Sequence, residues 1–130
     1  MAGTPGTSAT TLQEVSNAMV KLHKEQFGRG PTSARSDFAG ADTLVCVLRD
    51  ALLPAELKMA ELGEQNRVRD SRNAFQAATE ADFVSAVERI VNRKVVAFAS
   101  GVDPNANTVF ETFHFAPRDS GSDGHRTLTT

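Results

Sequence analysis

A chain of 130 residues is long enough for one domain with a modest hydrophobic core. Its hydrophobic content of 40% and charged content of 23% are ordinary for a soluble globular domain. The net charge of −2 lacks the strongly basic balance of most nucleic-acid-binding domains, and the aromatic residues are all Phe. Tyr and Trp, which often stack on bases or anchor at a membrane interface, are missing. We therefore expect no nucleic-acid partner.

The N-terminal residues 1–9 are small and polar, with neither the basic nor the apolar region of a signal peptide. No window approaches the roughly 18 apolar residues of a membrane span. We therefore expect a cytoplasmic protein without direct membrane insertion. The single cysteine, Cys46, lies in the apolar run 44–48, so it cannot form an intramolecular disulfide. Its neighbours predict a buried small hydrophobe rather than a nucleophile.

Residues 1–9 are rich in Gly, Thr, Ser and Pro and are predicted to be a disordered leader. Thr11 with Glu14 forms a potential capping box, and apolar residues at helical spacing follow, so we predict a helix over 12–27. Gly28 suits the C′ position of that helix because glycine readily takes a positive φ. Pro31 cannot continue a helix, so the chain must leave in an extended conformation.

Two β-hairpins are predicted, one in each half of the chain. In the first, residues 32–38 are polar enough for an edge strand and residues 43–48 are apolar enough for a central strand. In the second, residues 94–100 read as a buried strand and 108–115 as the last strand. Residues 101–107 between them have strong turn chemistry, centred on Asp103-Pro104-Asn105.

Between the hairpins, Pro54 opens a helix that ends or bends at Gly63. A long apolar stripe then runs from Asn66 to Asn92. Thr79 could cap a second helix within this stretch, but we favour one long helix, kinked at most.

The element order α-ββ-α(α)-ββ predicts an α+β fold, a two-layer sandwich with a four-stranded antiparallel sheet and helices on one face. We expect the domain to span 10–117 and the polar segment 118–130 to be a disordered tail. Phe110 lies on the opposite side of its strand from Phe113 and Phe115, which indicates that both sheet faces are partly covered. We therefore predict a homodimer.

No arrangement of residues in the sequence indicates catalysis. His23, His114 and His125 are far apart and have no metal-ligand spacing, and no nucleophile-elbow or phosphate-loop motif is present. The acidic residues fall on predicted helix surfaces or in turns. We therefore expect no enzyme activity, no catalytic residue, no metal and no cofactor, because no catalytic set is visible.

The candidate binding residues of the sequence are a group of arginines. Arg69 and Arg72 share a face near the start of the long predicted helix, and Arg29 stands between Gly28 and Gly30. Two interpretations are open: a helix stop beside a solvated helix face, or a small-anion or metabolite site in which these five residues bind the ligand.

Several motifs in the ordered part of the sequence resemble the MpsC family. They are Gly28-Arg29-Gly30-Pro31, Leu52-Leu53-Pro54-Ala55-Glu56, residues 68–75, Val87-Glu88 and residues 93–98. The similarity covers about Leu12 to Pro117, and Leu53 departs from it because the family commonly has Thr there. The resemblance implies a soluble accessory subunit beside a membrane-potential-generating or bicarbonate transport system, with a membrane transporter subunit as partner. It supplies no catalytic residue, and its signature positions include Gly28, Arg29, Gly30, Pro31, Arg69 and Arg72.

Overall fold

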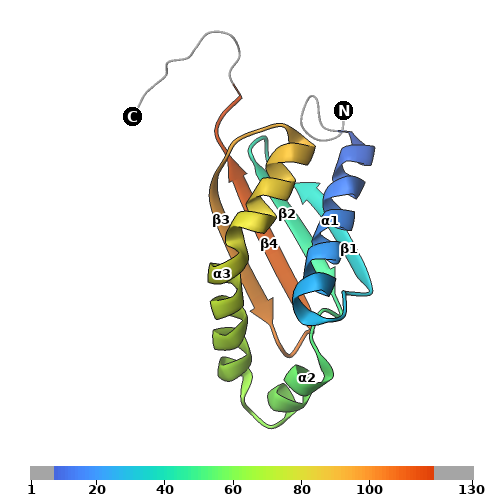
Figure 1. The fold of residues 1–130 in the computed structure, drawn as a ribbon, viewed down its shortest axis with the longest axis vertical. Coiled ribbons are helices and arrows are strands. Elements are labelled where there is room, and N and C mark those ends of the chain that lie inside the picture. Colours follow the sequence, from blue (N-terminus) through green and yellow to red (C-terminus); the bar gives the residue numbers. More distant parts are fainter. Residues whose placement is uncertain (1–7, 119–130) are drawn as a thin grey trace.

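The structure is a computed structural model that describes residues 8–118. Over this range the elements are α1 (Ala9–Phe27), β1 (Ser33–Phe38), β2 (Thr43–Arg49), α2 (Pro54–Glu61), α3 (Gln65–Val91), β3 (Val95–Asp103) and β4 (Thr108–Phe115). The strands form one antiparallel sheet in the order β1-β2-β4-β3. Figure 1 shows α1 and α3 lying across the same face of this sheet, with α2 beyond one end of the strands. The predicted α+β fold is therefore confirmed.

Helix α1 begins three residues before the predicted start. Ser8 is its N-cap, and the backbone N–H of Thr11 donates to the Ser8 side-chain oxygen over 3.0 Å. The predicted capping box at Thr11 is therefore wrong, because Ser8 offers the same cap one turn earlier and Thr11 lies inside the helix. Ser8 as the N-cap and Ala9 as the first helical residue are therefore part of the helix start rather than of a leader. Residues 1–7 and 119–130 of the predicted disordered ends lie outside the described residues.

The two glycines that flank Arg29 have separate structural roles. Gly28 adopts φ 82° and donates its N–H to the Lys24 carbonyl over 2.9 Å, so it ends α1 as predicted. A Cβ on Gly30 would lie 3.3 Å from both the carbonyl oxygen and a side-chain methyl of Val20. The loop therefore passes so close to α1 that only glycine fits without movement.

The sheet order confirms the predicted places of β1 at an edge and β2 in the centre. Strand β3 was predicted to be buried, and this is wrong. It forms the other edge, most of its residues beyond Val95 are exposed or half-buried, and a register shift interrupts its pairing with β4 between Val95 and Ala97. The strand also continues through Gly101 to Asp103, so the turn is shorter than predicted. The apolar residues of β3 predicted burial, but the sheet order leaves this strand with one neighbour.

Helix α3 runs without a break, as favoured from the sequence. Thr79 does not cap a second helix, because its hydroxyl donates to the Phe75 carbonyl one turn earlier over 2.7 Å. At the start of α2, the Glu56 carboxylate accepts the backbone N–H of Leu53 over 2.7 Å. This contact stabilises a helix start whose N-cap residue has no polar side chain.

The two faces of the sheet have different surroundings. The covered face, which packs against α1 and α3, carries the core residues of the strands, including Leu44, Cys46, Leu48, Val109, Phe113 and Phe115. The open face carries the alternate residues, including Arg35, Asp37, Val45, Val47, Phe110 and Thr112. Phe110 is 41% exposed and lies in register between Val47 on β2 and Gly101 on β3. An apolar strip therefore follows the middle of the open face.

Candidate functional site

Arg72 lies inside the protein, where it joins three segments. Its side chain forms a two-bond ion pair with Glu56 of α2, over 2.6 Å and 2.8 Å. Its Nη2 also donates to the Ala51 carbonyl over 3.1 Å, and its guanidinium carbon lies 3.7 Å from the centre of the Phe27 ring at the end of α1. Arg72 is only 4% exposed. Most of the hydrogen-bond donors of its guanidinium are therefore used in contacts within the protein.

The other two predicted arginines lie at the surface. Arg69 donates to the Asn66 side chain over 3.3 Å, and Arg29 is exposed in the loop after α1. The loop of Arg29 and the guanidinium of Arg72 are near each other, because Arg72 packs on Phe27 just before Gly28. However, Arg72 is turned toward Glu56, away from solvent. The anion site predicted from Gly28, Arg29, Gly30, Arg69 and Arg72 stays a prediction.

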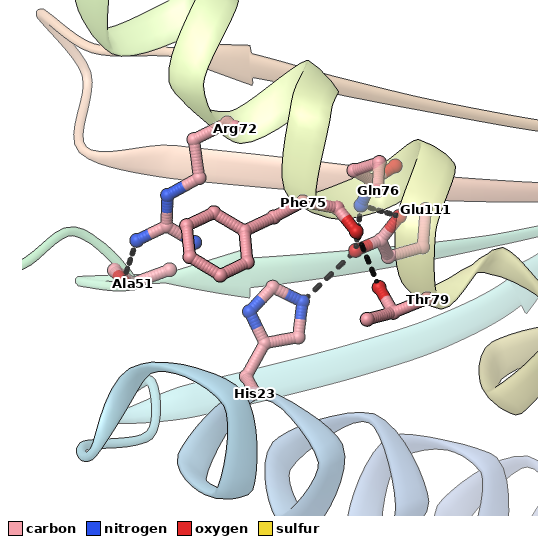
Figure 2. A network of polar contacts seen from close by, with 7 residues as sticks. All are labelled: His23, Ala51, Arg72, Phe75, Gln76, Thr79 and Glu111. Carbon is pink, nitrogen blue, oxygen red and sulfur yellow. Dashed lines mark hydrogen bonds and ion pairs between the residues drawn. The ribbon is translucent and has the colours of Figure 1, made fainter.

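A second buried polar cluster joins α1, α3 and β4 (Figure 2). His23 Nε2 lies 2.9 Å from the Glu111 carboxylate, and Gln76 donates to both oxygens of that carboxylate over 3.2 Å and 3.3 Å. Glu111 is fully buried and His23 is 1% exposed. A buried carboxylate requires such hydrogen bonds, so the cluster ties both long helices to a central strand.

The positions of His23 and Glu111 in the sequence are a signal for this cluster, although neither residue belongs to a known motif. His23 follows the buried Met19 by four residues and so continues the apolar face of α1. Glu111 alternates with Val109 and Phe113, so it shares their side of β4. A histidine on an apolar helix face and a carboxylate on an apolar strand face indicate a buried polar pair.

Basic side chains also gather at the opposite end of α3. Arg93, Lys94 and Arg118 line a surface hollow of about 260 Å³. Arg93 is held by Asp42 over 2.6 Å and by the carbonyls of Ala41 and Ala116, so its charge is largely compensated within the protein. This hollow lies outside the arginine set predicted from the sequence.

Cys46 behaves as the sequence predicted. It lies in the core with no exposed surface, and burial raises the pKa of its thiol from 9.0 to about 11, with the nearby Glu111 carboxylate adding to the rise and hydrogen bonds from Ser36 and Ser16 opposing it. A thiol held protonated in this way is a poor nucleophile. His114 is exposed, and its Nδ1 lies 2.9 Å from the Thr43 hydroxyl.

Among residues 8–118, no group of three or more His, Cys, Asp or Glu side chains is placed to hold a metal ion. In the same range, none of the helices has the length and apolar character needed to span a membrane. The buried side chains of Arg72 and Glu111 are instead paired with Glu56 and His23 across the helices and the sheet.

Comparison with known proteins gives one positive result. A family model described as "Na+-translocating membrane potential-generating system (MpsC)" matches residues 7–117. Neither a curated protein nor a solved structure matches the chain. The matched range includes every helix and strand of the fold, together with the loop of Arg29 and both polar clusters.

Proposed function

Because this chain belongs to the MpsC family, we propose that it is a non-enzymatic accessory and interaction domain of a membrane-potential-generating system. The open face of the sheet carries this proposal. Its central strip of Val45, Val47 and Phe110 is apolar, and neither long helix covers it. A two-layer domain with one uncovered apolar face is a typical unit for docking against another protein.

We assign a second copy of the chain to this face. Arg35 and Asp37 lie side by side on β1 next to the apolar strip, so one edge of the face presents both charge signs. A two-fold axis in the plane of the interface can bring Arg35 of one copy toward Asp37 of the other, because a symmetric interface pairs each residue reciprocally. The face is thus complementary to itself in charge and apolar at its centre.

The absence of an enzymatic role is supported by how the titratable groups are used. Arg72 is paired with Glu56, and His23 is paired with Glu111, all within the protein. A general acid or base must reach a substrate proton, and these side chains contact one another instead. We therefore propose that the domain acts through its surface, on a transporter subunit of a system that generates membrane potential or transports bicarbonate.

Three proteins test the proposal: the native chain, the Phe110→Asp variant and the Leu62→Asp variant. Leu62 is a matched control, since it is also an exposed large apolar residue but lies after α2, away from the sheet. Light scattering should give a dimer for the native chain and for Leu62→Asp. It should give a monomer for Phe110→Asp, because two buried carboxylates would face the apolar strip. A native monomer, or a dimeric Phe110→Asp variant, would contradict the assigned face.

The same three proteins are then added to vesicles that contain the membrane subunits of the system. The native chain and Leu62→Asp should increase the membrane potential or the bicarbonate uptake, measured with a potential-sensitive dye and with labelled bicarbonate. Equal signals with and without the native domain would contradict the accessory role, even if the dimer forms.

A further inference from the structure

A narrow crevice between α3 and the edge strand β3 reaches one residue of each buried polar cluster, His23 and Arg72. It is lined by His23, Arg72, Gln76, Ser100 and Val109 among others, and its volume is about 10 Å³. That volume is close to the minimum that holds one water molecule. The crevice therefore has room for a ligand of a single heavy atom between the two long helices and the sheet.

Two buried nitrogen atoms that belong to residues lining this crevice have no hydrogen-bond partner within residues 8–118. They are Nδ1 of His23, on α1, and Nη1 of Arg72, on α3. The other nitrogen atoms of both side chains are already engaged with Glu111, Glu56 and Ala51. Leaving a buried polar atom unpaired costs its full desolvation, so an occupant that satisfies both atoms is favoured.

From these observations we propose that the crevice is a binding site for one water molecule that bridges His23 Nδ1 and Arg72 Nη1. Arg72 can only donate, so the occupant must accept a hydrogen bond. A cation is thereby excluded. His23 donates from Nε2 to the Glu111 carboxylate, so its Nδ1 is a donor if the ring is charged and an acceptor if the ring is neutral. Water serves in both states, whereas a halide serves only the charged one.

The charges around the crevice also favour a neutral ligand. The positive charge of Arg72 is matched by Glu56, and the carboxylate of Glu111 faces His23. An anion would add a further negative charge to a buried set that is neutral at most, at a high cost of desolvation. The bridging water extends the hydrogen-bonded chain from Glu111 through His23 to Arg72.

Nuclear magnetic resonance on the labelled native protein tests this site in solution. Water-selective cross-relaxation should give cross-peaks from a water that tumbles with the protein to the His23 ring and to the Arg72 guanidinium protons. The rings of Phe113 and Phe115, which are equally buried but lie in the apolar core, should give none. Absence of the His23 and Arg72 cross-peaks would overturn the proposal.

A pair of variants at Val109 locates the water. Val109→Ile adds a methylene at the crevice wall and should remove the His23 cross-peak, whereas Val109→Ala enlarges the crevice without adding a polar group and should keep it. Retention of the cross-peak in a folded Val109→Ile variant would place the water elsewhere and overturn the assignment.

Crystals grown in sodium bromide test whether the crevice binds an anion instead of water. An anomalous bromide peak within about 3.5 Å of His23 Nδ1 and Arg72 Nη1 would show an anion site and overturn the proposal.

Discussion

The covered and open faces of the sheet use the same strands for different purposes. On β4, Glu111, Phe113 and Phe115 point toward the helices and are buried, while Phe110 and His114 on the other side are exposed. The covered face combines an apolar core with the His23–Glu111 pair, and the open face combines an apolar strip with surface charges. The difference shows that the position of the helices, rather than the composition of the strands, decides which aromatic residues stabilise the fold and which remain available to a partner.

The largest effect is expected from truncating the two aromatic residues of β4 separately. Phe113→Ala should lower the free energy of unfolding by about 3–5 kcal/mol, since Phe113 is fully buried and its loss leaves a cavity. Phe110→Ala should change it by less than about 1 kcal/mol when measured at high dilution, because that ring is already part-exposed in a single chain. Urea unfolding measures both values. Equal losses would mean that the open face is also covered within one chain.

An intermediate effect is expected when the buried and the exposed ion pairs are compared. Glu111→Gln should lower the free energy of unfolding by about 1–3 kcal/mol, because the new amide NH2 group would stand where a carboxylate oxygen now accepts from Gln76 or His23, so that two donors would face each other. Asp37→Asn breaks the pair with Arg35 on the open face and should cost at most about 1 kcal/mol, because both side chains are largely exposed.

These two values follow from urea unfolding at neutral pH. A smaller loss for Glu111→Gln than for Asp37→Asn would contradict the stabilising role assigned to the buried cluster. Crystal structures of both variants, compared with that of the native protein, would show whether the neighbouring side chains have moved.

The smallest effect is a loss of stability at alkaline pH that depends on Cys46. The pKa of its thiol is about 11 in the folded chain against 9.0 for an exposed thiol, so the folded state keeps its proton at a pH where the unfolded chain has lost it. This contribution is fully present below pH 9 and falls as the pH rises toward 11, by about 1.4 kcal/mol at pH 10. The Cys46→Val variant should lack this part of the alkaline loss. Parallel pH profiles of the native and variant unfolding free energies would contradict the predicted linkage.

Local sequence patterns were sufficient for most of the fold. The glycine after α1, the proline at the start of α2 and the unbroken stripe of α3 act through neighbouring residues, so each could be predicted without tertiary information. The start of α1 was misplaced because two neighbouring residues, Ser8 and Thr11, are both good caps. The family could also be predicted, from motifs whose order and spacing are preserved along the chain.

The candidate site was less accessible to the same reasoning. Arg69 and Arg72 share a helix face in the sequence, yet Arg69 lies at the surface and Arg72 inside, because Glu56 and Phe27 approach only Arg72 in the folded chain. Likewise, strand β3 has the apolar residues of a buried strand, but its place at the sheet edge exposes it. Spacing along the chain reveals neither which residues pack against Arg72 nor which strands lie beside β3.

The sequence alone determined the types of element, their order and the two hairpins, because hydrogen bonding and side-chain period act over a few residues. Only the tertiary structure decided which polar side chains meet: His23 and Glu111 are 88 residues apart in the chain but 2.9 Å apart in space. The physical reason is that a buried charged or polar group is unfavourable unless it has a hydrogen-bond partner. Packing, rather than distance along the sequence, decides which partner lies beside it.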